Sequence, residues 1–144
     1  MEDIEMNLML PGNPRYQPKE LVPYFGYDNL MRGLADVEIA NLQILGEIQA
    51  IPQEDITLLT LELANKLQAI TTTEVDIRER KTKHDVRAWV QIAQEITGPK
   101  LGRWVHALLT SYDVIDSGRI LHYVRAYQDV ILPTTKEIIL LLAE

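Results

Sequence analysis

Apolar residues recur at helical spacing along most of this chain. Between residues 30 and 48 they return every three or four positions, and they do so again from Ile56 to Leu67. This period is typical of an amphipathic helix, whereas a half-buried strand would alternate apolar and polar residues. No stretch alternates for long, so the pattern predicts an all-α protein.

Helix-breaking and capping residues divide this pattern into segments. Six Pro and Gly residues between positions 11 and 26 predict an irregular N-terminal arm. Asp28 or Asn29 is expected to cap the first long helix. Thr71 to Thr73 are expected to cap a short helix over 74–82, and Gly98-Pro99 to end a helix that begins at His84.

The segment from Tyr112 to Glu144 predicts the longest helix. Pro133 interrupts it, because proline removes one internal hydrogen bond and should kink or split the helix. Residues 138–143 (IILLLA) are apolar nearly all round, and such a helix requires cover on every side. We expect either a fragment of a larger helix bundle or a chain that buries this run by self-association.

Composition limits the classes of function. The 144 residues predict one domain, and the absence of cysteine fits a reducing cytoplasm. No apolar run is long enough for a membrane span, and a net charge of −7 disfavours nucleic-acid binding. Between Arg78 and Arg103, however, basic residues outnumber acidic ones, which favours a small anionic ligand; a solvated helix face is the alternative.

Two phrases bring chemical groups to predicted helix starts. They are residues 81–86 (KTKHDV) and residues 104–113 (WVHALLTSYD). Thr110 and Asp113 fit a helix cap, and Asp85 could cap the helix after His84. The same helix start, with the hydroxyls of Thr110 and Ser111, could instead receive a carboxylate or phosphate.

The remaining candidates are weaker taken singly. His106 lies in an apolar phrase and could be a core residue or contact an anion, and His122 is assigned to structure or surface. Arg15-Tyr16 offers a guanidinium suited to phosphate or carboxylate. No phosphate-binding loop or zinc-protease motif occurs, so we predict no metal and no cofactor.

Taken in order, these phrases resemble the adenylosuccinate lyase family of the fumarase/aspartase superfamily. The resemblance rests on Arg15-Tyr16, on residues 46–52 (GEIQAIP), on 82–86 (TKHDV), and on 103–106 (RWVH) leading to 110–116 (TSYDVID). It covers roughly residues 14–144. It implies an N-terminal helical domain over 1–111, and the start of a long helix of the central bundle over 112–144.

The family catalyses β-elimination of fumarate from adenylosuccinate, giving AMP, and from the succinylated imidazole-carboxamide nucleotide. By resemblance, substrate-binding residues would be Arg15, Tyr16, Lys83, His84, Asp85, His106, Thr110 and Ser111. His84 and His106 are supporting candidates, and no catalytic residue is assigned. The implied partners are the nucleotide substrate and a homotetramer, with no nucleic acid or membrane.

The sequence also departs from the family. Lys83 stands where bacterial relatives usually have Arg, and Ala107-Leu108 replaces a more usual Tyr-Gly. The family's later segments, with its acid/base histidine and serine loop, do not occur here, so we expect the chain alone to be inactive. Argininosuccinate lyase and a non-catalytic helical interaction module remain the rival hypotheses.

Overall fold

The computed structural model describes residues 13–143, and this part of the chain forms helices and no strand. The prediction of an all-α protein is therefore confirmed for these residues. Residues 13–26, the part of the N-terminal arm that the structure describes, contain only short helices, as their Pro and Gly content predicts. The elements are η1 Pro14–Tyr16, η2 Lys19–Leu21, α1 Val22–Phe25, α2 Tyr27–Glu47, α3 Gln53–Ile56, α4 Leu61–Gln68, α5 Thr72–Thr82, α6 Asp85–Gly102, α7 Ser111–Ala126, η3 Tyr127–Ile131 and α8 Leu132–Leu142.

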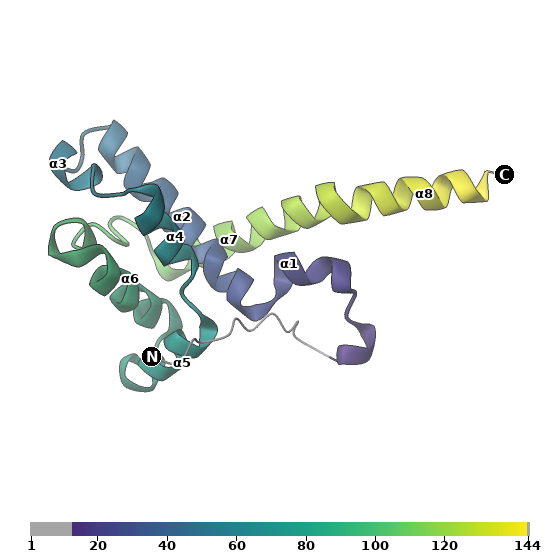
Figure 1. Ribbon diagram of the computed structural model, residues 1–144, viewed down its shortest axis with the longest axis horizontal. Helices are drawn as coiled ribbons and strands as arrows, with labels where there is room; N and C mark the ends of the chain where they lie inside the picture. Colours follow the sequence, from purple (N-terminus) through teal and green to yellow (C-terminus); the bar gives the residue numbers. More distant parts are fainter. Residues whose placement is uncertain (1–12, 144) are drawn as a thin grey trace.

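The core lies where α2, α4, α5, α6 and α7 meet (Figure 1). Trp89 of α6 is its largest fully buried side chain, and Leu42 of α2, Leu67 of α4 and Val114 of α7 are buried around it. Leu42 and Leu67 belong to the apolar stripes of the sequence. Burial of these stripes is the main driving force for assembling the helices.

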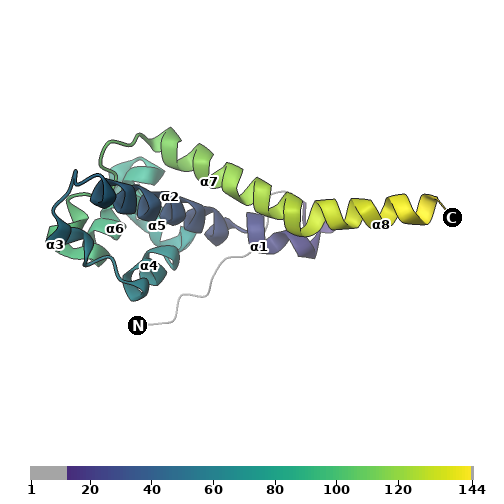
Figure 2. The same cartoon turned by 90° about the horizontal axis from the view of Figure 1, so that it is seen from above.

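The helices α2 and α7 pack against each other over most of their length (Figure 2). They approach most closely at two glycines: a Cβ added to Gly118 would lie 2.9 Å from the carbonyl carbon of Gly33. His122 is buried beside this crossing, where desolvation is the main cause that lowers its pKa. The expectation that His122 is structural agrees with this position.

One predicted cap is wrong. The helix α2 begins at Tyr27 after Gly26, and Asp28 lies inside its first turn. The Asp28 carboxylate instead accepts the backbone N–H and the hydroxyl of Thr72, both at 2.6 Å. Asp28 therefore stabilises the start of α5, where Thr71, one of the threonines expected to cap this helix, forms a capping box with Glu74.

Pro133 does not end the long C-terminal helix. A π-helical turn, η3, joins α7 to α8, and the flanking Ala126 and Leu132 keep right-handed helical dihedral angles. A turn with wider hydrogen bonding accommodates the missing N–H of Pro133 and the bulk of its ring. The result is a continuous helical rod, whose α8 extends away from the other helices (Figure 2).

Candidate functional site

The turn between α5 and α6 presents three of the predicted residues. Lys83 ends α5 in a left-handed conformation, with φ of 56°. His84 then caps α6: its backbone is extended, and its Nδ1 lies 3.4 Å from the backbone N of Arg87. The cap is thus His84 and not Asp85, which is the first residue of the helix. All three side chains are exposed to solvent.

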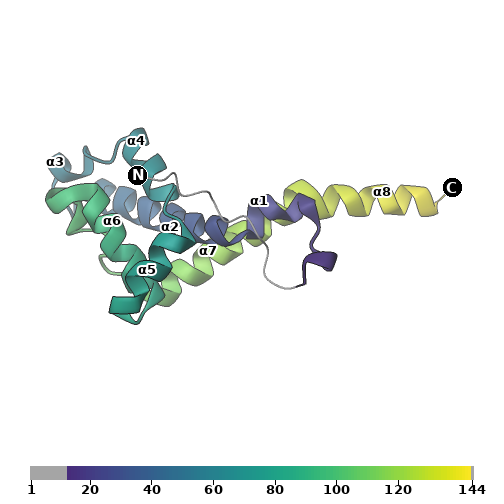
Figure 3. The same cartoon turned by 60° about the horizontal axis from the view of Figure 1, so that its bottom comes forward.

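The two segments that carry the candidate functional groups, residues 81–86 and 104–113, meet at this turn. The Nε2 atom of His84 lies 3.3 Å from the hydroxyl oxygen of Ser111, the first residue of α7. The starts of α6 and α7 therefore lie side by side below the body in Figure 3. Each start is the positive end of a helix dipole, so a single anion could contact both.

The Nδ1 atom of His84 has two possible hydrogen-bond partners. It lies 3.2 Å from a carboxylate oxygen of Asp85 as well as near the N–H of Arg87. A neutral ring cannot accept from Arg87 and donate to Asp85 through the same nitrogen. With the proton on Nδ1, His84 donates to Asp85, and Nε2 can accept the hydroxyl proton of Ser111.

Thr110 is already engaged as a helix cap. Its backbone N–H and its hydroxyl donate to the same carboxylate oxygen of Asp113, at 2.6 and 2.8 Å. Both hydrogen bonds lower the pKa of Asp113, and the one from the backbone N–H has the larger effect. Among the two adjacent hydroxyls, Ser111 is consequently the more available to a ligand.

The segment between α6 and α7 is fixed by buried acidic residues. Asp55 of α3 accepts from the side chains of Arg103, at 2.5 Å, and Trp104, at 2.8 Å. Glu38 of α2 contacts His106 through both carboxylate oxygens. His106 is thus held against α2, and its ring remains partly exposed.

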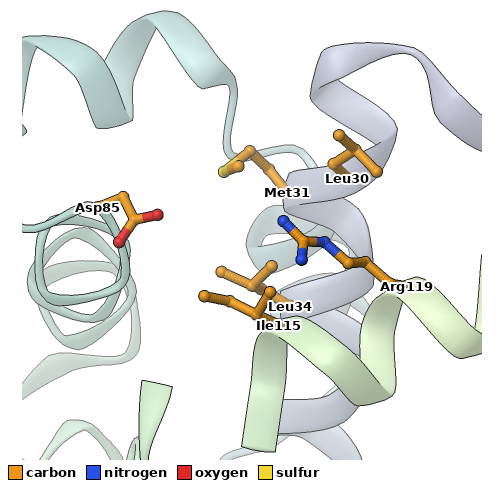
Figure 4. A pocket seen from close by; sticks show the side chains of 6 residues that line it. All are labelled: Leu30, Met31, Leu34, Asp85, Ile115 and Arg119. Carbon is orange, nitrogen blue, oxygen red and sulfur yellow. The ribbon is translucent and has the colours of Figure 1, made fainter. Parts of the chain in front are cut away.

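A small pocket adjoins the His84–Ser111 contact. It measures about 90 Å³, and its walls come from α2, the first residue of α6, and α7. Figure 4 shows the Arg119 guanidinium and the Asp85 carboxylate on opposite sides, with Met31 and Ile115 between them. Apolar walls with one charge of each sign suit a small ligand that has an apolar part and an anionic group.

Arg15 and Tyr16 are not brought to this site. They form η1, and Tyr16 is 76% exposed. In Figures 1 and 3, η1 lies apart from α5 and from the start of α6. The structure therefore unites Lys83, His84, Asp85 and Ser111, and leaves the N-terminal pair separate.

Sequence reasoning missed Arg119, Glu38 and Asp55. Arg119 had a readable signal, because it follows Ser111 by eight residues, which places it on the same face of α7 as Ile115. Glu38 had none, since its partner His106 is 68 residues away in the sequence. Asp55 is buried and paired with Arg103 and Trp104, which are 48 and 49 residues away in the sequence.

Two classes of feature do not occur in the part of the chain that the structure describes. No group of three or more His, Asp or Glu side chains is arranged to hold a metal ion there. Within residues 13–143, no helix is both long enough and apolar enough to span a membrane.

Known proteins provide an independent comparison. Adenylosuccinate lyase of Aquifex aeolicus is 31% identical over 118 residues, which is 82% of this chain and 26% of the relative. The enzyme of Methanothermobacter thermautotrophicus is 30% identical over 77% of the chain, and that of Bacillus subtilis 28% over 82%. This chain is related to adenylosuccinate lyase over part of that enzyme's length.

The resemblance drawn from the motifs is thereby confirmed. The chain spans about a quarter of the length of these adenylosuccinate lyases. No family model matches the chain, and no solved structure matches it.

Proposed function

We propose that this chain is the substrate-holding part of an adenylosuccinate lyase. The reaction would be β-elimination of fumarate from adenylosuccinate and from the succinylated imidazole-carboxamide nucleotide. The 3.3 Å contact between His84 and Ser111 carries the proposal, because it joins both motifs of the resemblance in one place. In this proposal, residues 1–111 form the N-terminal domain and 112–144 begin the central bundle.

The chemistry of the site supports this assignment. Adenylosuccinate carries a phosphate and two carboxylates, and the site offers the Lys83 ammonium, the Ser111 hydroxyl and two adjacent helix starts. His84 would bind or orient the substrate, and His106 would support a bound anion. Arg119 adds a guanidinium that can form forked hydrogen bonds to a carboxylate or phosphate.

Nucleotide binding tests the proposal. Isothermal titration calorimetry with AMP and with adenylosuccinate should detect binding to the chain, and Ser111→Ala or His84→Ala should weaken it by on the order of tenfold. Ser117→Ala is the matched control, since Ser117 is an exposed serine of the same helix. Absence of binding by the unaltered chain, or equal losses in the control, would contradict the proposal.

The chain alone is expected to release no fumarate from adenylosuccinate. The proposed site holds binding groups, and none of its residues is assigned the acid/base role that β-elimination requires. The ultraviolet absorbance of fumarate measures the reaction directly. Turnover by the purified chain without an added partner would show that the proposed division of roles is wrong.

A helical interaction module is the second candidate function. It is favoured by α8, where Ile138, Ile139, Leu140, Leu141 and Leu142 are all more than half exposed. This candidate predicts stable assembly with no nucleotide affinity. The calorimetric titration therefore discriminates between the two functions.

A further inference from the structure

Glu38 contacts the predicted site residue His106 through both of its carboxylate oxygens. One carboxylate oxygen accepts the backbone N–H of His106 at 2.9 Å, and the other lies 2.6 Å from its Nδ1. The Glu38 side chain is 1% exposed, whereas that of His106 is 21% exposed. A buried carboxylate thus contacts both the backbone and the Nδ1 atom of His106, and the rest of the ring is partly exposed to solvent.

This contact defines the chemistry of the ring. The Glu38 carboxylate can only accept hydrogen bonds. The proton of a neutral His106 must then lie on Nδ1, which leaves Nε2 as the nitrogen available to a ligand. Metal-binding histidines are oriented by a carboxylate in the same way.

The backbone of this segment also needs support. His106 and Leu108 both adopt left-handed conformations, with φ of 66° and 63°, which are unfavourable for residues with a side chain. Asn41, one turn after Glu38 on α2, donates its amide N–H to the carbonyl of Ala107 at 3.0 Å. Two side chains from one face of α2 therefore hold this segment in a strained shape.

The ring of His106 lies near the start of α7. His106 lies close enough to Asp113 to contribute to the lowered pKa of that carboxyl, and Asp113 caps the helix that begins with Ser111. A protonated His106, with its charge balanced by Glu38, would add a donor beside this helix start. A phosphate monoester or a carboxylate matches such a donor.

We infer that Glu38 is a positioning residue, which holds Nδ1 of His106 as a donor and leaves Nε2 as the ring nitrogen that meets the substrate. Nε2 accepts from a substrate N–H or O–H when the ring is neutral, and it donates to an anionic group when the ring is protonated. The inference rests on the proposed function for the identity of that substrate. The orientation of His106 itself does not depend on it, so the two can fail separately.

Nitrogen NMR of histidine-labelled chain tests the inference. Long-range ¹H–¹⁵N spectra distinguish the two neutral tautomers, and the chain has only three histidines, so a His106→Gln variant assigns the signals. The unaltered chain should show His106 with its proton on Nδ1. A neutral His106 with its proton on Nε2 would overturn the inference without need of any further variant.

The variant Glu38→Gln then tests whether the Glu38 carboxylate is what keeps the proton of His106 on Nδ1. Glutamine keeps the size of the side chain and removes its charge, so the proton should redistribute between Nδ1 and Nε2, and AMP affinity should fall by on the order of tenfold. Glu47→Gln, at the exposed end of the same helix, is the matched control and should change neither. An unchanged His106 spectrum in Glu38→Gln would overturn the inference. Failure of the unaltered chain to bind AMP would contradict the proposed function, and the spectra would still decide the role of Glu38.

Discussion

At the scale of single residues, buried carboxylates connect segments that are far apart in the sequence. Asp28 accepts from Thr72, Glu38 from His106, and Asp55 from Arg103 and Trp104. All three acids are 1% exposed. A buried carboxylate is costly unless hydrogen bonds satisfy it, and these do so with donors from the parts of the chain that position the site.

Asp55→Asn should lower the free energy of unfolding by about 2 kcal/mol, because the variant loses charge-assisted hydrogen bonds to Arg103 and Trp104. Urea denaturation at neutral pH measures this change. Glu54→Gln, at the exposed neighbouring position in α3, is the control and should have little effect. A loss as small as that of the control would show that Asp55 contributes little.

The same residue predicts a pH dependence. Hydrogen bonds from Trp104 and then Arg103 lower the pKa of Asp55, so the folded state binds fewer protons than the unfolded state. Its contribution to stability is present above the unfolded pKa and is lost as the pH falls through the lowered folded pKa. Urea denaturation over a series of acidic pH values should show that Asp55→Asn loses less stability than the unaltered chain. Equal losses in both would contradict this origin.

Sequence reasoning reached the local residue contacts and missed the distant ones. The pairing of Thr110 with Asp113 was predicted as a cap, because both partners lie within one helical turn. Asp28 was assigned to the nearest helix start, yet it stabilises α5, 44 residues away. Local patterns cannot rank such contacts, because they depend on how α2 packs against the other helices.

At the scale of elements, the crossing of α2 and α7 depends on two residues without side chains. The apolar stripes predicted both helices, but they did not predict where the helices touch. Gly33 and Gly118 mark that point, and an added Cβ on Gly33 would lie 2.8 Å from Nε2 of His122. The ring of His122 is therefore buried directly against this crossing, and small residues are required there by packing and not by backbone conformation.

Gly118→Ala should destabilise the chain by about 1–3 kcal/mol, because the added methyl would lie within 3.0 Å of the Gly33 backbone and would force the helices apart. This loss should exceed the intrinsic gain in helix propensity from glycine to alanine. Thermal unfolding followed by circular dichroism measures the change. Ser117→Ala, on the exposed side of α7, should be neutral or slightly stabilising. Stabilisation by Gly118→Ala would show that α2 and α7 lie farther apart than described.

At the scale of the whole molecule, the helical rod determines the shape. Its first half, α7, is partly buried against α2, whereas α8 projects beyond the other helices (Figure 2). The sequence predicted that residues 138–143 require cover. The residues that the structure describes leave them uncovered, since Leu141 and Leu142 are 70% and 82% exposed. An apolar helix of this kind is typical of a surface that another helix covers.

Self-association through α8 is therefore expected, and it would also fit the homo-oligomer that the proposed function requires. Size-exclusion chromatography with light scattering should give a mass that rises with concentration. The double variant Ile138→Glu with Leu141→Glu should be monomeric, because these residues lie on one face of α8 and glutamate carboxylates resist burial. Gln128→Glu with Thr134→Glu adds the same charge at exposed polar positions and should keep the mass of the unaltered chain. If the unaltered chain is monomeric at every concentration, or if both double variants behave alike, α8 is not the surface through which copies of this chain associate. In that case its apolar face would need a different partner, and the interaction-module hypothesis would have to name one.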